Sequence, residues 1–169
     1  MAIVNEDLYK IDIGILPKDA CIVIVHTQWN SGTVNKLLEG CIRILQQYGM
    51  NNYKVVSVPG AFEIPFTIKS LWNNYQHISG NQKIEKPQAF IALGCILRGG
   101  TPHFDYVCKA VTDGVLHLNL TLPVPTIFGV LTVDNQLQAD ERTGGAHGHK
   151  GEESALSALK MIAFGNALH

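Results

Sequence analysis

Hydrophobic residues follow two alternating patterns along this chain: short apolar runs, and longer stretches with a single apolar face. Three runs, at 21–25, 89–94 and 126–131, are almost uniformly apolar, which is typical of strands buried on both faces of a sheet. A fourth run, at 54–58, has the sequence KVVSV and predicts another strand. The chain is therefore expected to form four strands separated by other elements.

The stretches that follow these runs place apolar residues three and four positions apart, which predicts amphipathic helices. Asn30 or Ser31 is expected to cap the first helix, and Gly49 to end it. Pro65 lies in the first turn of the second helix, where proline is tolerated. The expected apolar stripes are Val34, Leu37, Leu38, Cys41, Ile42 and Leu45 in the first helix, Ile68, Leu71, Trp72 and Tyr75 in the second, Phe104, Val107, Cys108, Val111, Val115 and Leu118 in the third, and Leu156, Leu159 and Ala163 in the last.

Three further segments complete the predicted organisation: a polar loop at 77–87, a short helix near 136–142, and a glycine- and histidine-rich loop at 143–151. Strands that alternate with amphipathic helices predict a parallel sheet covered on both faces. Right-handed crossovers then place every strand-to-helix loop at one edge of the sheet, where ligands bind in such folds. The loops expected at that edge are 27–30, 59–63, 98–103 and 132–134.

Composition narrows the class of protein. A chain of 169 residues, 46% hydrophobic and with a net charge of −1, fits one domain over 1–169 and gives no electrostatic reason to bind nucleic acid or an anionic membrane. The apolar runs are much shorter than a membrane span, and the first residues lack a secretory signal, so a cytoplasmic protein is expected. None of the four cysteines forms a CxxC pair, and we expect them to be reduced packing residues.

The segment ALGCILRGGTPHFDYVC, residues 92–108, carries the most distinctive chemistry. An apolar strand ends in a Gly-Gly turn, and a helix begins a few residues later, beside Arg98, Thr101, His103 and Asp105. Free N–H groups and the helix dipole favour an anion at such a position. Because an imidazole passes protons near neutral pH, the segment predicts chemistry on a phosphorylated small molecule.

Three side chains in the edge loops allow two interpretations each. Trp29 either stacks on a flat heterocycle or caps the hydrophobic core. Glu63 either complements a helix dipole or accepts hydrogen bonds from sugar hydroxyls. His103 is either a structural residue or a proton carrier, and its place near Arg98 and Gly100 favours the proton carrier.

The glycine-rich loop raises two further questions. Arg142 and Lys150 flank it, and each either reaches an anionic ligand or is simply solvated. His147 and His149 form an H-x-H pair, but no other ligands of suitable spacing accompany them, so no metal site is expected.

Several segments together resemble the 6,7-dimethyl-8-ribityllumazine synthase family. These are VPGAFEIP at 58–65, LGCILRGGTPHFDYVC at 93–108, PTIFGVLT at 125–132, and Glu141-Arg142 with the glycine-rich loop that follows. The resemblance runs in order from about Ile11 to Ala163. It implies a flavodoxin-like three-layer α/β/α sandwich with a central four-stranded parallel sheet. It also implies condensation of 5-amino-6-(D-ribitylamino)uracil with 3,4-dihydroxy-2-butanone 4-phosphate, without cofactor or metal.

The resemblance also implies a role for individual residues. His103 would shuttle protons, and Trp29 would stack on the pyrimidine. The other substrate-binding residues would be Ala61, Phe62 and Glu63 for the ribityl chain, Cys95, Ile96 and Leu97 for the heterocycle, Gly100, Thr101 and Arg142 for the phosphate, Lys150 for the uracil or ribityl part, and Phe128 from a neighbouring subunit.

Members of this family form homopentamers, and some assemble twelve pentamers into an icosahedral shell, which we favour here over a free pentamer or decamer. The resemblance implies that an N-terminal arm, residues 1–20, adds a strand to a neighbouring subunit's sheet, and LYKIDI at 8–13 has the required alternation. The sequence departs from the family at Trp29, where many members carry Phe, in the longer loop 77–87, and at His147 and His149.

Two other kinds of function are compatible with the same scaffold. One is a non-catalytic flavin- or lumazine-binding protein, which Trp29 favours and which His103 and Arg142 argue against. The other is a chiefly structural shell protein, which would have no need of polar groups converging at one edge of the sheet.

Overall fold

A four-stranded parallel sheet forms the centre of the computed structural model, which describes residues 10, 16–17, 19–77 and 86–168. The strands run in the order β2-β1-β3-β4, so β3 lies between β1 and β4. Their bounds are Cys21–Thr27 for β1, Tyr53–Val58 for β2, Pro87–Leu97 for β3 and Thr126–Val133 for β4. The four expected strands and their parallel pairing are therefore confirmed.

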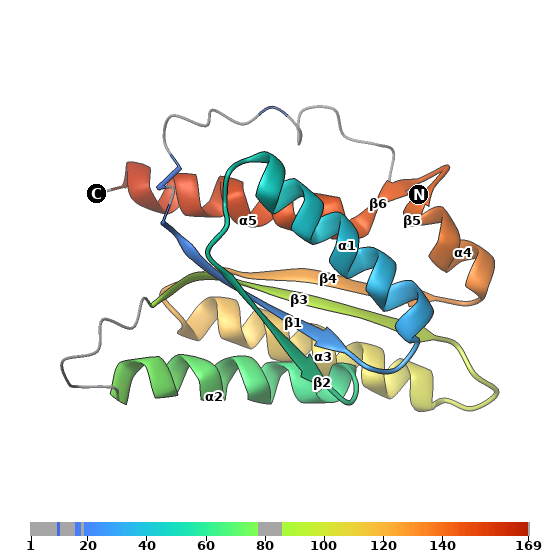
Figure 1. Cartoon of the computed structure of the whole chain (residues 1–169). Coiled ribbons are helices and arrows are strands. Elements are labelled where there is room, and N and C mark those ends of the chain that lie inside the picture. The colour runs from blue at the N-terminus through green and yellow to red at the C-terminus, as the bar shows by residue number, and fades with distance from the viewer. Residues whose placement is uncertain (1–9, 11–15, 18, 78–85, 169) are drawn as a thin grey trace.

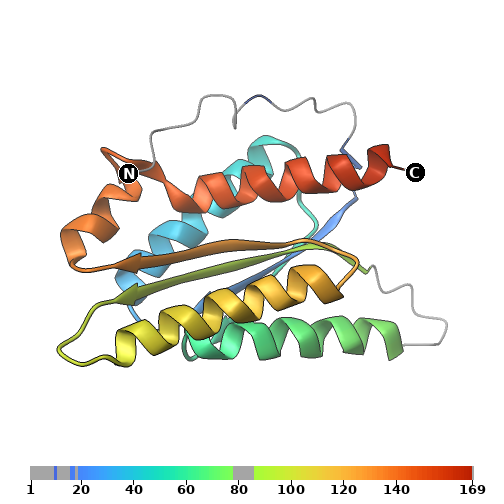
Figure 2. The same ribbon diagram turned by 180° about the vertical axis from the view of Figure 1, so that it is seen from behind.

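Helices cover both faces of this sheet and give the expected three layers (Figures 1 and 2). One face carries α1 (Ser31–Gln47) and α5 (Lys150–Ala167). The other carries α2 (Ile64–His77), preceded by the 3-10 turn η3 (Ala61–Glu63), and α3 (His103–Thr121). The short helix α4 (Gln136–Glu141) follows β4, close to its expected position.

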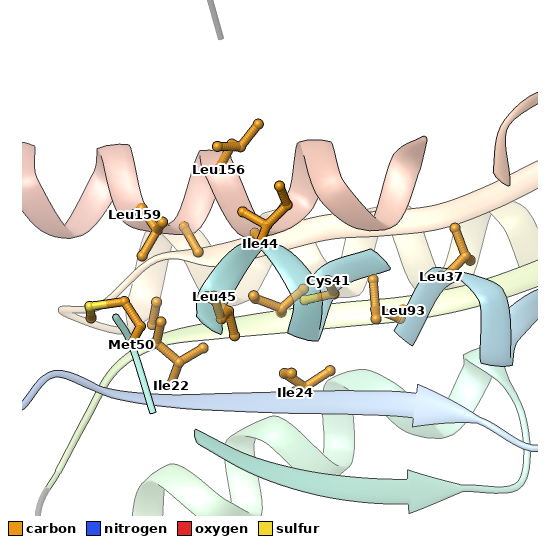
Figure 3. Close-up of a cluster of buried hydrophobic side chains, with 14 of the residues drawn as sticks. Ile22, Ile24, Leu37, Cys41, Ile44, Leu45, Met50, Leu93, Leu156 and Leu159 are labelled. Carbon is orange, nitrogen blue, oxygen red and sulfur yellow. The ribbon is translucent and has the colours of Figure 1, made fainter. Parts of the chain in front are cut away.

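The hydrophobic core consists of two clusters, one on each face of the sheet. Residues 21–25 of β1 are at most 1% exposed, which explains why that run is apolar at every position instead of alternating. On the α1–α5 face, Ile22, Ile24 and Leu93 of the strands meet helix side chains (Figure 3). The helix side chains drawn there include Leu37, Cys41, Ile44, Leu45, Leu156 and Leu159. The core thus joins α1 and α5 to the sheet.

All four cysteines are free thiols. Cys21, Cys41 and Cys95 are buried, as expected of packing residues, whereas Cys108 is only half-buried. No helix among the described residues has the length and apolar character needed to cross a bilayer.

The glycine-rich segment differs from the expected loop. It forms a small antiparallel hairpin from β5 (Thr143–Gly145) and β6 (Gly148–His149), and α5 begins directly afterwards at Lys150. Gly144 and Gly148 have φ values of 108° and 83°, a backbone region that glycine tolerates best. Strands of two or three residues show no measurable hydrophobic period, which is why the pattern predicted only a loop.

Two expectations fall largely outside the described residues. They are the N-terminal arm 1–20 with its proposed strand at 8–13, and the surface loop 77–87.

Helices α1 and α5 approach each other closely, and the approach depends on glycine. A Cβ atom on Gly151 would lie 2.0 Å from the carbonyl oxygen of Leu37, and a Cβ on Gly40 would lie 2.2 Å from Cε1 of His149. Neither contact leaves room for a methyl group. The hydrogen side chain of each glycine therefore sets the distance between the two helices.

We expect Gly151→Ala to lower the free energy of unfolding by about 1–3 kcal/mol or more, because the new methyl group forces the helices apart. Gly165→Ala, in the same helix but with nothing within 4 Å of the added Cβ, is the matched control. The control should be neutral or stabilising by about 0.5–1 kcal/mol, since alanine is the better helix former. Urea denaturation of both variants measures this, and equal stabilities would contradict the close approach.

Candidate active site

The loops after β1, β2 and β3 surround a cavity of about 610 Å³ at the carboxyl edge of the sheet. After β1 the chain turns into α1 on one face, whereas after β3 it turns into α3 on the other face (Figure 1). Neighbouring strands whose connections leave in opposite directions open a crevice between their ends. The strand order β1-β3 therefore positions this cavity.

Eight residues expected at the site line this one cavity, although they come from three separate parts of the sequence. They are Trp29, Ala61, Phe62, Glu63, Cys95, Ile96, Leu97 and His103, and the lining is completed by Thr27, Asn30, Gly60 and Val107. The structure therefore brings together most of the residues predicted to bind one substrate.

Two aromatic side chains give the cavity flat apolar walls. Trp29 is 71% exposed and Phe62 is 64% exposed, although both are large and apolar. A tryptophan that caps a core has most of its surface covered, so this exposure favours the stacking interpretation of Trp29. The backbone N–H of Trp29 donates to the Pro59 carbonyl at 3.2 Å, which joins the loop after β1 to the loop after β2.

Asn30 lies at the N-cap of α1 but does not cap it as the sequence suggested. Its backbone is left-handed, with φ 57° and ψ 42°, and its side chain accepts no capping hydrogen bond. Instead, Asn30 Nδ2 donates to the Cys95 carbonyl at 2.8 Å. A short polar side chain in a left-handed conformation is an uncommon arrangement that often marks a functional position. Here it joins the ends of β1 and β3 across the crevice, directly beside Trp29.

The cavity combines an apolar floor with two titratable groups at its rim. Burial raises the pKa of Cys95 to about 11, although a hydrogen bond with Thr33 acts in the opposite direction. Its thiol is therefore protonated at neutral pH and is not a nucleophile. Glu63 ends η3, and His103 is the first residue of α3. An imidazole and a carboxylate beside an apolar floor can move protons and bind hydroxyl groups.

A second cavity, of about 420 Å³, lies beside the hairpin and contains the two cations that the sequence singled out. It is lined by Val130, Leu131, Thr132, Val133, Gln138, Glu141, Arg142, His147 and Lys150. Arg142 Nη2 lies 2.9 Å from Glu153 Oε2, and Lys150 Nζ lies 3.5 Å from the same oxygen. Arg142 also donates to the His147 carbonyl. Two positive charges share the carboxylate of Glu153, and Glu141 contributes a second carboxylate to the lining. The guanidinium of Arg142 and the ammonium of Lys150 are the groups of this cavity that can bind an anion.

Within one chain, the structure does not gather every expected site residue into one place. Arg142 and Lys150 line the second cavity, and His103 lines the first. Gly100 and Thr101 are exposed in the loop before α3 and line neither cavity. Phe128, in β4, is half-buried against the α2–α3 cluster and lines neither as well.

Sequence reasoning missed Glu153, the carboxylate that holds Arg142 and Lys150. Its position three residues after Lys150, on the same face of the final helix, was the available indication.

The two histidines of the H-x-H pair lie in different environments. His147 Nε2 lies 3.6 Å from Glu141 Oε2, whereas His149 is only 9% exposed and lies against Gly40 of α1. His149 Nδ1 is buried without a hydrogen-bond partner among the described residues. Burial lowers the pKa of His149, an effect that nearby Glu152 opposes and Arg43 reinforces. His149 therefore supports the hairpin next to Lys150 as a neutral ring.

Comparison with known proteins gives one consistent family. The family profile of 6,7-dimethyl-8-ribityllumazine synthase matches residues 19–165. A protein of that name from Parabacteroides distasonis is 40% identical over 168 residues, covering 97% of this chain and 99% of its own. Proteins of the same name from Porphyromonas gingivalis and Bacteroides fragilis are 43% and 41% identical, covering 95% and 83% of this chain and 96% and 93% of their own.

We expect His149 to make the protein less stable as the pH falls from about 7.5 to about 5.5. The unfolded chain binds the proton with an ordinary pKa near 6.5, whereas the folded chain holds a lowered pKa, so acid favours unfolding below that value. His149→Asn removes this titration. Urea denaturation at both pH values should show a smaller loss of stability in the variant than in the wild type. An identical loss in both proteins would contradict burial of a neutral His149.

Proposed function

The chain belongs to the 6,7-dimethyl-8-ribityllumazine synthase family, and we propose that its two cavities are the two halves of that family's active site. The reaction condenses 5-amino-6-(D-ribitylamino)uracil with 3,4-dihydroxy-2-butanone 4-phosphate to give 6,7-dimethyl-8-ribityllumazine. Phosphate and water are released, and the reaction is the penultimate step of riboflavin biosynthesis. The enzyme is a transferase.

The observation that carries the proposal is the aromatic cavity at the carboxyl edge. A pyrimidine ring stacks on Trp29, over the apolar floor formed by Cys95, Ile96 and Leu97. The ribityl chain lies along Ala61 and Phe62, and its hydroxyls donate to Glu63. This pose fills the cavity with one flat ring and one polar chain, which matches its apolar walls and polar rim.

Proton transfer and phosphate departure take place at the start of α3. The 5-amino group attacks the ketone of the four-carbon substrate, a C–N bond forms, and the hydroxyl leaves as water to give an imine. His103 carries protons between these groups. A proton then leaves the hydroxyl-bearing carbon next to the imine, a carbon–carbon double bond forms, and the C–O bond to phosphate breaks, with Gly100 and Thr101 at the helix start stabilising the departing anion. The enol that results takes up a proton at its terminal carbon and becomes a ketone. The ribityl nitrogen attacks this ketone, a second C–N bond forms, and the carbonyl oxygen leaves as water.

The second cavity, which contains Arg142 and Lys150, completes this site from a second copy of the chain. Arg142 and Lys150 lie in a cavity separate from His103 within one chain, yet a phosphorylated substrate needs a cation near its leaving group. A head-to-tail contact, in which the second cavity of one copy faces the first cavity of the next, supplies it and places Phe128 near the same interface. Such contacts close into a ring. We propose a homopentamer, assembled further into an icosahedral shell.

Residues 1–169 act as one domain in this proposal, with residues 1–20 as an arm toward the neighbouring copy. The four free cysteines fit the reducing environment of the cytoplasm. Light scattering of the purified protein distinguishes a pentamer from a decamer or a 60-subunit shell.

Mixing the two substrates with the protein should produce the fluorescent lumazine faster than the uncatalysed reaction. His103→Ala should lower turnover by about a hundred- to ten-thousandfold yet leave residual activity, because binding two substrates in register still accelerates the reaction. Steady-state fluorescence measures both rates. If the wild type forms no product above the uncatalysed rate, a non-catalytic lumazine- or flavin-binding protein is favoured. If His103→Ala still binds both substrates but loses all activity, the assignment of only proton transfer to His103 is contradicted.

A mixture of two impaired variants tests whether the site is shared. His103→Ala damages the first cavity and Arg142→Ala damages the second. When the two chains are unfolded together and refolded as mixed assemblies, about a quarter of head-to-tail interfaces contain both intact halves, and activity should recover to about that fraction. Separately refolded proteins, mixed afterwards, are the control. Activity no higher than that of the separate variants would show that each chain builds its site alone.

A further inference from the structure

Arg98 follows β3 directly and connects three elements around the loop 99–102. Its backbone N–H donates to the Val133 carbonyl at 2.9 Å, which extends the pairing of β3 with β4. Its side chain then reaches beyond the sheet on both sides of that loop. Arg98 Nε lies 2.7 Å from Asp134 Oδ1 in the β4–α4 loop, and Arg98 Nη1 lies 3.2 Å from Asp105 Oδ1 in the first turn of α3.

An aromatic contact completes this arrangement. The guanidinium carbon of Arg98 lies 4.0 Å from the centre of the Phe104 ring, within the range of a cation–π interaction. The hydrogen bond with Asp134 raises the pKa of Arg98, and the charge of Asp105 acts in the same direction. We call Arg98, Phe104, Asp105 and Asp134 the Arg98 clamp.

The loop inside this clamp is exposed and rich in glycine. A Cβ atom on Gly99 or on Gly100 would meet nothing within 4 Å, and the loop residues 99–102 are exposed. Glycine also gives the backbone its greatest conformational freedom. The backbone hydrogen bonds described here lie at the two ends of the loop, from Arg98 N–H to the Val133 carbonyl and from Asp105 N–H to the Pro102 carbonyl at 3.0 Å. The clamp adds side-chain contacts at the same two ends.

We propose that Arg98 is a positioning residue that holds the loop 99–102 ready for the phosphate of the four-carbon substrate, an inference that rests on the phosphate-binding role proposed above for Gly100 and Thr101. Asp134 and Asp105 take up Nε and Nη1 of the guanidinium, and the role proposed for Arg98 is to hold the loop rather than to bind the phosphate itself. A loop that is already ordered loses less entropy when the anion binds.

Loss of the Arg98 clamp should have a distinctive effect, because the charged side chains of the clamp are exposed. Side chains of Arg98, Asp105 and Asp134 are 43%, 62% and 60% exposed, and exposed ion pairs contribute little to global stability. Loss of the clamp should therefore change loop order and substrate affinity while leaving the melting temperature close to that of the wild type. A purely structural residue would show the opposite.

The test compares Arg98→Ala, Asp134→Ala and the double variant in steady-state kinetics with each substrate varied in turn. Each single variant should raise the KM for the phosphorylated substrate by about three- to tenfold, and the double variant should raise it no further, because both changes release the same loop. The KM for the pyrimidine should stay unchanged. Asp113→Ala is the matched control, since it breaks the exposed Lys109–Asp113 pair of 2.7 Å on α3 away from the loop.

The outcomes separate the clamp from direct phosphate binding. If Asp134→Ala leaves the KM for the phosphorylated substrate unchanged or lowers it, while Arg98→Ala raises it, Arg98 binds phosphate directly and the proposal is overturned.

Hydrogen exchange of the amides of residues 99–101 gives a measurement that needs no activity. Exchange should accelerate in Arg98→Ala and in Asp134→Ala, and unchanged exchange in both would overturn the clamp even if the wild type makes lumazine normally. Faster exchange together with a wild type that makes no product would refute the proposed reaction and leave the clamp standing.

Discussion

The parallel pairing of β3 with both β1 and β4 is the constraint on which the site depends. Within the eleven-residue strand β3, residues 87 and 89–93 pair with β1 and residues 90–97 pair with β4, and residues 89–96 are buried. Parallel neighbours need long crossover connections, which here are helices on the two faces of the sheet. All loops that follow the strands consequently meet at one edge. A crevice, the proposed substrate site, opens between β1 and β3 because α1 and α3 leave toward opposite faces.

The same topology explains why the two cavities described above lie apart in one chain. The strand β4 lies at the far side of β3 from β1, so its loop and the hairpin after it are displaced from the aromatic cavity. Glu153 of α5 then holds Arg142 and Lys150 next to that hairpin. An isolated cation is costly to bury, and the shared carboxylate of Glu153 holds both side chains beside the cavity. In the proposed oligomer, the groups that would bind the phosphate are thus already in place in the chain that supplies them to its neighbour.

Sequence alone predicted the layers of the fold well and the arrangement of the site less completely. Buried strands such as Cys21–Val25 and the apolar stripe of α1 follow simple periods, and the structure confirms both. Asn30 or Ser31 was expected to cap α1. The Asn30 side chain instead donates to the Cys95 carbonyl, which is 65 residues away in sequence. The resemblance implied that Arg142 joins Gly100 and Thr101 at the phosphate, and within one chain Arg142 lines a cavity that those two residues do not line. Periodicity describes which face a residue occupies, whereas contacts between distant loops depend on the assembled sheet.

The exposure of the aromatic walls links assembly to catalysis. Trp29 and Phe62 leave most of their surface in water in a single chain, and burying side chains of this size is strongly favourable. A neighbouring copy that covers the first cavity would gain this burial and exclude water from His103 at the same time. Charge interactions strengthen as water leaves, so the cations of the second cavity stabilise a departing phosphate more effectively once the two halves meet. The proposed oligomer is therefore part of the chemistry, because the site reaches a low-dielectric environment only when two copies close it.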